Sequence, residues 1–113
     1  MLGASVGVIA AYLIAHVKFH DTSWLKSEYV DVTAKLEEEF GGIHVASGRH
    51  EHVEGSDVGT VTSVVQFPSI EAARAFWNHP DYQRVAAIRR AGSECQVVLL
   101  DAETVAGPFA SHS

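Results

Sequence analysis

The sequence predicts an α+β fold in which a four-stranded antiparallel sheet carries two helices on one face. Segments with strand-like apolar patterns alternate with segments of helical spacing, and their order is β-α-β-β-α-β. Hydrophobic residues make up 47% and charged residues 19% of the 113 residues, which is enough to fill the core of one domain.

The strands are predicted from alternating or continuous apolar residues. In the first strand, every second residue from Leu13 to Phe19 is apolar, which gives the strand one face suited to a core. A bulge is expected in the second strand at Gly48. The expected strands cover residues 12–19, 43–53, 60–67 and 96–101.

The helices are bounded by capping residues and glycines. Residues 20–23 are expected to cap the first helix, which ends at Gly41-Gly42, and Glu37 to Glu39 near its end are interpreted as a solvated face. The second helix follows Phe67-Pro68-Ser69. It is expected to break at His79-Pro80, because proline disfavours helical geometry in the preceding residue but suits the first position of a new helix.

Composition narrows the possible partners. The formal net charge is −6 and no run of Lys or Arg is present, so nucleic acid and anionic membranes are poor partners. The sequence has no glycine-rich phosphate loop and no dinucleotide-binding fingerprint. Cys95 is the single cysteine, so no intrachain disulfide can form and a cytoplasmic location is expected.

The ends of the chain are expected to lie outside the domain. Residues 1–10 are interpreted as a flexible lead-in, residues 11–102 as the domain and residues 103–113 as a tail. The uncharged run at 1–15 lacks the basic region of a signal peptide. It is also shorter than the roughly 20 apolar residues of a membrane helix.

Arg89 is the first candidate for a binding residue. Helical spacing places it on one apolar face with Tyr82, Val85 and Ala86. A buried charge needs a partner, because burying it alone costs several kcal/mol. Its guanidinium could clamp a carboxylate, phenolate or enolate ligand, or it could form a buried ion pair with Glu54 or cap strand carbonyls.

Four other residues have both a chemical and a structural interpretation. Glu54 is either a general base or an acceptor that fixes the turn at Gly55. His16 is either a proton-transfer group or a structural histidine of the first strand. Tyr29 and Tyr82 lie on helix faces that should meet the sheet, where they either donate to a substrate oxygen or pack as aromatic residues.

The segment His50-Glu51-His52-Val53-Glu54 raises the possibility of a metal site. On a regular strand, His50, His52 and Glu54 share one face, and two imidazoles with a carboxylate can bind non-haem iron or zinc. Polar residues also suit an edge strand, where they discourage further pairing. We therefore expect no metal and no other cofactor in the native protein, and histidines that are at least partly exposed.

The sheet face opposite the helices is also apolar, with Ile14, Val64, Val98 and Leu100 expected on it. An apolar sheet face left in water is typical of an interface. A homodimer in which two such faces pack together is therefore expected.

A set of short motifs resembles domain of unknown function family 1330, in the dimeric α+β barrel superfamily. The motifs are Gly41-Gly42, Glu54-Gly55, Phe67-Pro68-Ser69, Glu71-Ala72-Ala73, Tyr82-Gln83 and Arg89, and the resemblance spans roughly Tyr12 to Ala102. It implies a ferredoxin-like monomer, face-to-face pairing of sheets in a dimer, and a pocket between sheet and helices. Related families include heme-free quinone-forming monooxygenases, muconolactone isomerase, stress-responsive barrel proteins and polyketide cyclases.

Three functions remain open from the sequence. The first is a cofactor-independent isomerase, cyclase or monooxygenase-like enzyme, in which Arg89 holds a small, partly apolar acid or ketone and His16 or Glu54 moves a proton. The second is a ligand-binding or stress-related dimer without catalysis. The third is a metal-dependent enzyme built on His50, His52 and Glu54.

Overall fold

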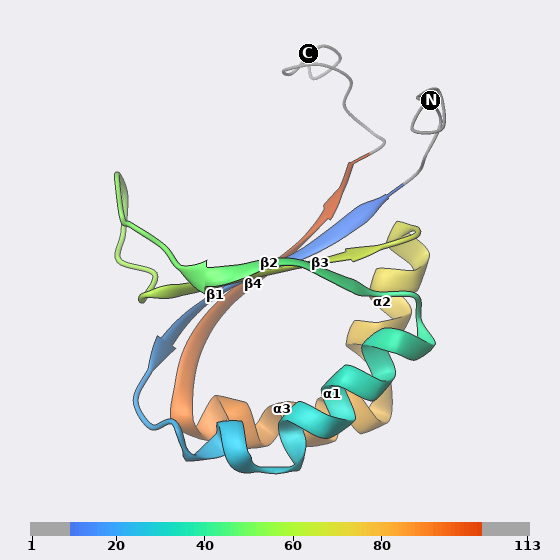
Figure 1. The fold of residues 1–113 in the computed structure, drawn as a ribbon, viewed down its shortest axis with the longest axis horizontal. Helices are drawn as coiled ribbons and strands as arrows, with labels where there is room; N and C mark the ends of the chain where they lie inside the picture. Colours follow the sequence, from blue (N-terminus) through green and yellow to red (C-terminus); the bar gives the residue numbers. More distant parts are fainter. Residues whose placement is uncertain (1–9, 103–113) are drawn as a thin grey trace.

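The computed structural model describes residues 10–102, in which helices cover one face of a curved sheet (Figure 1). The predicted order of strands and helices is confirmed, with a short 3₁₀ helix added before the first α-helix. The elements are β1 (Ala11–Phe19), the 3₁₀ helix η2 (Ser23–Lys26), α1 (Glu28–Glu39), β2 (Ile43–Arg49), β3 (Val61–Phe67), α2 (Ile70–Asn78), α3 (Pro80–Gly92) and β4 (Ser93–Asp101).

The described residues include the two ends of the expected domain but little of the segments that flank it. The expected tail at 103–113 lies outside them, as does the lead-in apart from Ala10. Ala10 is buried, and its carbonyl accepts a hydrogen bond from the backbone N–H of Ala102 at 3.1 Å. Ala10 is therefore tied to the end of the domain.

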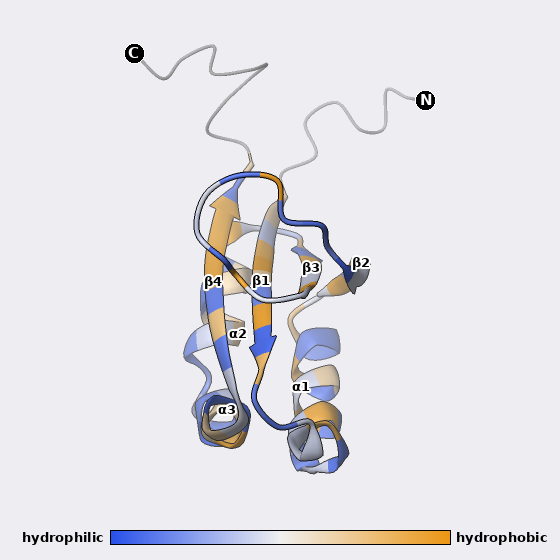
Figure 2. Cartoon of the chain, turned by 90° about the vertical axis from the view of Figure 1, so that its left-hand side faces the viewer, coloured by the Kyte–Doolittle hydropathy of each residue, from blue (hydrophilic) through white to orange (hydrophobic). Residues whose placement is uncertain are grey.

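The sheet is antiparallel throughout, and its strands lie in the order β2-β3-β1-β4. Figure 2 shows this order from right to left across the sheet. The expected position of β2 at an edge is confirmed. The central strand β1 pairs along its length with β4 and β3. Its side chains point alternately into the core and to the opposite face of the sheet.

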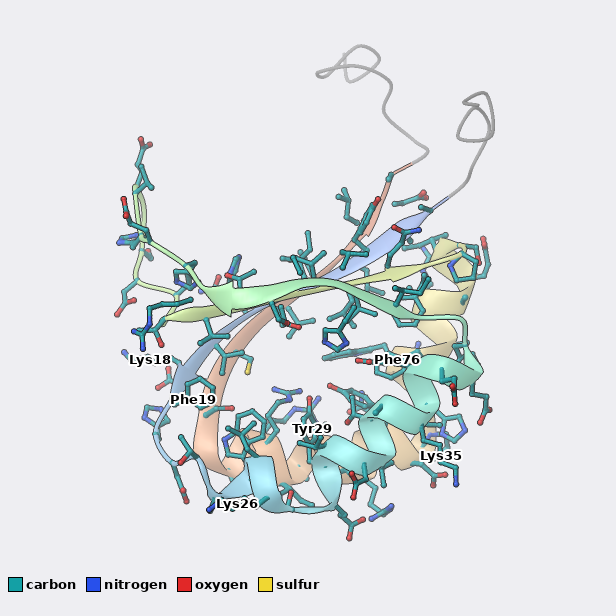
Figure 3. The ribbon with its side chains drawn as sticks, in the orientation of Figure 1. Lys18, Phe19, Lys26, Tyr29, Lys35 and Phe76 are labelled. Atoms are coloured by element: carbon teal, nitrogen blue, oxygen red, sulfur yellow. The ribbon has the colours of Figure 1, made fainter. Side chains whose placement is uncertain are left out.

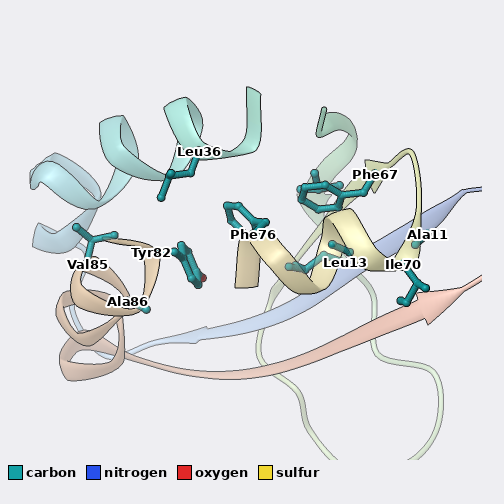
Figure 4. Close-up of a cluster of buried hydrophobic side chains, with 11 residues drawn as sticks. Ala11, Leu13, Leu36, Phe67, Ile70, Phe76, Tyr82, Val85 and Ala86 are labelled. Carbon is teal, nitrogen blue, oxygen red and sulfur yellow. The ribbon is translucent and has the colours of Figure 1, made fainter. Parts of the chain in front are cut away.

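The core lies between the sheet and the helices α2 and α3, and Leu36 of α1 also packs into it (Figure 4). Leu13 and Val17 of β1 are buried on the helix side, as the alternation predicted. Phe67, Phe76 and Val85 are the largest fully buried side chains among the described residues. Burial of each such side chain contributes about 1.5–3 kcal/mol, which is what holds the helices on this face.

The first α-helix begins later than predicted, because the segment before it forms a separate 3₁₀ helix, and a different polar side chain marks the start of each. Asp21 accepts a hydrogen bond from the Ser23 backbone N–H at 2.7 Å and introduces only the short helix η2. Ser27 then adopts extended backbone and caps α1, accepting from the Tyr29 N–H at 3.1 Å. The expectation that residues 20–23 cap the main helix is therefore wrong.

The second helix breaks where the sequence predicts. Ser69 caps α2 by accepting from the Ala72 N–H at 3.0 Å. His79 has extended backbone at the junction, and its ring Nδ1 accepts from the Asp81 N–H at 3.0 Å, so the residue before Pro80 caps α3. Among residues 10–102, no helix has the length and apolar character needed to cross a membrane.

The second strand is shorter than predicted. It ends at Arg49 instead of Val53, and its irregularity lies between His44 and Ala46 instead of at Gly48. Beyond Arg49, the backbone N–H of His50 still donates to the Thr60 carbonyl at 2.9 Å, and the His50 ring lies 2.7 Å from the Thr62 hydroxyl and 2.8 Å from the Gly59 carbonyl. The residues that follow form an exposed loop.

Candidate ligand-binding pocket

A cavity of about 330 Å³ lies between α1 and the helix-facing side of the sheet. Helix α1 packs mainly on α3 and η2, which leaves space between α1 and the strands. In Figure 3, Tyr29 projects from α1 toward the sheet, across this space. The apolar and aromatic lining includes Leu13, Val17, Phe19, Trp24, Val61, Val65, Phe76, Trp77 and Val97. This size and lining are typical of a small-molecule site.

Arg89 of α3 lines this cavity and is only 5% exposed. The position of Arg89 on a buried helix face, which the helical spacing predicts, is therefore confirmed. Its Nη2 donates a hydrogen bond to the Tyr82 hydroxyl at 3.4 Å, and its guanidinium carbon lies 5.8 Å from the centre of the Tyr29 ring. The ion pairs found among residues 10–102 do not include Arg89.

The electrostatics of this end of the cavity favour an anion. Burial opposes the charge on Arg89, but Tyr82 and Tyr29 raise the pKa of Arg89, so its pKa lies above the ordinary value. Burial also raises the pKa of Tyr29, which keeps the Tyr29 hydroxyl protonated at neutral pH. The cavity therefore presents a guanidinium and a phenol that can both donate to a ligand oxygen.

Two further polar side chains of the cavity wall lack partners. Trp24 Nε1 and Thr33 Oγ1 are buried without a hydrogen-bond partner among the described residues, and both residues line the cavity. An unsatisfied buried donor costs about 1–3 kcal/mol.

The cavity wall also holds a polar group that the sequence analysis did not identify. Glu37 of α1 has a side chain only 12% exposed, and its carboxylate lies 3.2 Å from His44 Nδ1. His44 Nε2 lies 3.1 Å from Ser63 Oγ, to which Ser47 Oγ donates at 2.9 Å. Glu37, His44 and Ser63 all line the cavity. The interpretation of Glu37 as part of a solvated face is therefore wrong.

A bulge in β2 explains how two of these side chains share one side of the sheet. His44 pairs with Val65 and Ser47 pairs with Ser63, whereas Val45 is the extra residue between paired positions. Residues three apart on a regular strand point to opposite faces. The extra residue at Val45 restores His44 and Ser47 to the same side, facing the helices.

His16 does not reach the cavity. It lies on the opposite face of the sheet, where its Nδ1 is 2.7 Å from Thr62 Oγ1. His50 shares the same hydroxyl, and the two imidazole rings meet edge to face with their centres 5.6 Å apart. The structure thus brings these histidines together with Thr62, on the face expected to be covered in a dimer.

Glu54 also lies away from the cavity, in the exposed loop between β2 and β3. It forms no ion pair with Arg89 in the described structure. Because the strand ends at Arg49, the expectation that His50, His52 and Glu54 share one strand face is wrong. Within residues 10–102, no group of three or more His, Cys, Asp or Glu side chains is placed to hold a metal ion.

Comparison with known proteins agrees with this fold. The family model described as "Domain of unknown function (DUF1330)" matches residues 10–102, which confirms the resemblance expected from the motifs. A comparison with curated proteins gave no match.

Several solved structures share the fold at low sequence identity. A protein of unknown function from Rhodopseudomonas palustris is 16% identical, with a TM-score of 0.66 over 89% of this chain and 85% of that chain. SnoaB, a cofactor-independent oxygenase from Streptomyces nogalater, is 15% identical, with a TM-score of 0.59 over 91% and 99%. A dimeric ferredoxin-like protein of unknown function from Jannaschia is 18% identical, with a TM-score of 0.59 over 80% and 97%. The ferredoxin-like α+β fold is therefore established.

Proposed function

Since the chain belongs to the family described as Domain of unknown function (DUF1330), its role has to be argued from its own pocket, and we propose that it binds a small, partly apolar acid through Arg89. The observation that carries this proposal is a buried guanidinium on the cavity wall without a carboxylate partner in the described structure. Leaving such a charge uncompensated is costly. An anionic ligand would compensate it.

The shape of the guanidinium and its neighbours favours a carboxylate or an enolate. The planar fork of Arg89 can donate two parallel hydrogen bonds to such a group. Tyr29 and Tyr82, which the sequence suggested as substrate-binding residues, stand beside it. The aromatic and aliphatic walls of the cavity would hold the apolar part of the ligand.

The favoured function within this proposal is cofactor-independent acid–base chemistry, such as that of an isomerase, a cyclase or a monooxygenase-like enzyme. The likeness to SnoaB supports it by analogy of fold alone. His16 and Glu54 lie outside the cavity, so the proton would have to move through other groups. The same contacts would serve a ligand-binding dimer without catalysis, whereas the metal-dependent alternative has no support among the described residues.

We further propose that the protein is a cytoplasmic homodimer. Val98 is 56% exposed on the outer sheet face, where Leu100 is also exposed and Ile14 and Val64 are half-buried. Dimeric ferredoxin-like proteins are among the structures that share this fold. A free thiol at Cys95 fits a reducing compartment.

Two matched ligands can test the carboxylate clamp. Phenylpyruvate is a small keto acid with an aromatic ring, and phenylacetone is the same ketone with a methyl group in place of the carboxylate. Isothermal titration should show that the protein binds phenylpyruvate more tightly, by about ten- to a hundredfold, as expected for hydrogen bonds to a charged group.

The variant Arg89→Leu should abolish this difference between the two ligands, while Arg74→Leu, which removes an exposed arginine of α2, should preserve it. Equal affinity of the wild type for both ligands, or an unchanged preference in Arg89→Leu, would overturn the proposal.

A further inference from the structure

Glu37, His44 and Ser63 form a contiguous polar group that carboxylate binding at Arg89 does not require. It joins α1, β2 and β3 at the cavity. The His44 side chain is half exposed, whereas the Glu37 side chain is largely covered. A ligand in the cavity could therefore reach this group while the carboxylate behind it stays shielded from water.

The order of donors and acceptors follows from what each group can do. A carboxylate only accepts, so the 3.2 Å contact between His44 Nδ1 and Glu37 places the ring proton on Nδ1. In the neutral imidazole, Nε2 is then the acceptor, and Ser63 Oγ donates to it. Ser47 Oγ donates to one lone pair of Ser63 Oγ, which leaves the other lone pair free.

We propose that Ser63, His44 and Glu37 form a proton relay that takes a proton from an enolisable carbonyl compound bound in the cavity. This inference rests on the proposed function, because Arg89 would hold the anionic end of that compound. His44 is the general base, Ser63 passes the proton, and Glu37 is a positioning residue that fixes the imidazole tautomer. A hydroxyl, a base and a carboxylate that orients the base form a known type of catalytic arrangement. Such an arrangement is recognised by the roles and the geometry of its residues.

The proposed step balances without a redox partner. The free lone pair of Ser63 Oγ takes the proton of a carbon next to the ligand carbonyl, while the original Ser63 proton moves to His44 Nε2. The electron pair of the broken C–H bond stays on the ligand as an enolate, and the imidazolium is paired with Glu37. Return of a proton to the same carbon or to another carbon of the enolate completes enolisation or isomerisation and restores all three side chains.

The local structure argues against a merely solvated ion pair. Glu38 and Glu39 on the same helix end are exposed, whereas Glu37 is turned toward the cavity. The carboxylate near the end of α1 faces an unfavourable helix dipole, and burial adds to this cost. The bulge at Val45 also interrupts the β2–β3 ladder. Bulges are common next to active sites, where they re-aim a side chain.

The test measures binding and proton exchange separately, with phenylpyruvate as the probe. Titration reports binding, and proton NMR in D₂O reports loss of the benzylic C–H signal beyond the rate in buffer alone. The wild type should accelerate this exchange. His44→Gln and Ser63→Ala should bind the probe but lower the acceleration by about 10²-fold or more, as expected for a lost acid–base group.

A second readout addresses the positioning role of Glu37. Long-range ¹H–¹⁵N spectra should show the Nδ1–H tautomer of His44 in the wild type and in Glu38→Gln. In Glu37→Gln, the Nε2–H tautomer should appear and the exchange should slow by about tenfold or more, with binding retained.

The outcomes separate the two proposals. Binding of phenylpyruvate without accelerated exchange would overturn the relay and leave the Arg89 clamp in place. Exchange that is unaffected in His44→Gln would also overturn the relay, as would a wild-type His44 in the Nε2–H tautomer. Absence of binding would overturn the clamp, and the relay with it.

Discussion

Arg89 and Tyr82 lie two turns apart on α3, and the guanidinium of Arg89 donates to the Tyr82 hydroxyl over 3.4 Å. This distance lies beyond the usual range for an N–H···O hydrogen bond, so the contact is weak. Arg89 has five N–H groups. One weak contact to the Tyr82 hydroxyl leaves most of its hydrogen-bonding capacity for a ligand.

The variant Arg89→Leu should keep or increase the stability of the protein in the absence of ligand. An arginine without a carboxylate partner loses no ion pair on substitution, and replacing a buried charge with a hydrophobic residue is often neutral or stabilising by about 1–4 kcal/mol. Urea unfolding monitored by circular dichroism provides the measurement. A loss of about 3–5 kcal/mol would instead indicate a broken buried ion pair.

Glu37 should make stability depend on pH. Burial raises the pKa of Glu37 above its usual value of 4.5, and the nearby His44 partly offsets this. The folded state therefore holds the Glu37 proton more tightly than the unfolded state. Stability consequently falls as the pH rises from 4.5 through the folded-state pKa, and the cost persists above it.

Glu37→Gln removes this titration, so the stability of the variant should increase relative to that of the wild type as the pH rises. The difference in melting temperature, variant minus wild type, should be larger by a few degrees at about pH 7 than at about pH 4. Calorimetry at both pH values gives this difference. Glu38→Gln, at an exposed neighbour, should show no such trend, and a difference that shrinks with rising pH would contradict the burial of Glu37.

The sequence predicted those features of the site that depend on local periodicity. Alternation placed Leu13 on the core side of β1, and helical spacing placed Arg89 on the buried face of α3. The inward position of Glu37 had a weak indication in the sequence that was not used. Glu37 lies four residues after Thr33, so the two share one face of α1, and this face lines the cavity. The position of His44 depends on a bulge, and its contact with Ser63 depends on pairing between strands, neither of which has a local sequence signal.

The turn between α1 and β2 should be sensitive at Gly42. A Cβ atom there would lie 2.9 Å from the ring of Phe67, which is fully buried. Gly42→Ala should therefore lower the free energy of unfolding by about 1–3 kcal/mol, as overpacking typically does. Gly48→Ala is the matched control in β2, because a Cβ atom at Gly48 meets nothing within 4 Å. Equal stability of the two variants in urea unfolding would contradict this packing.

The outer face of the sheet should be a dimer interface centred on β1, β3 and β4. An interface of this kind should bury more than about 1,000 Å² in total, and an exposed Val98 on β4 would lie within it. Val98→Lys would place a charge in the apolar contact, so sedimentation velocity should show a shift from dimer to monomer at micromolar concentration. Val53→Lys, in the exposed β2–β3 loop, should remain a dimer. A wild-type protein that sediments as a stable monomer would show that this apolar face has another role.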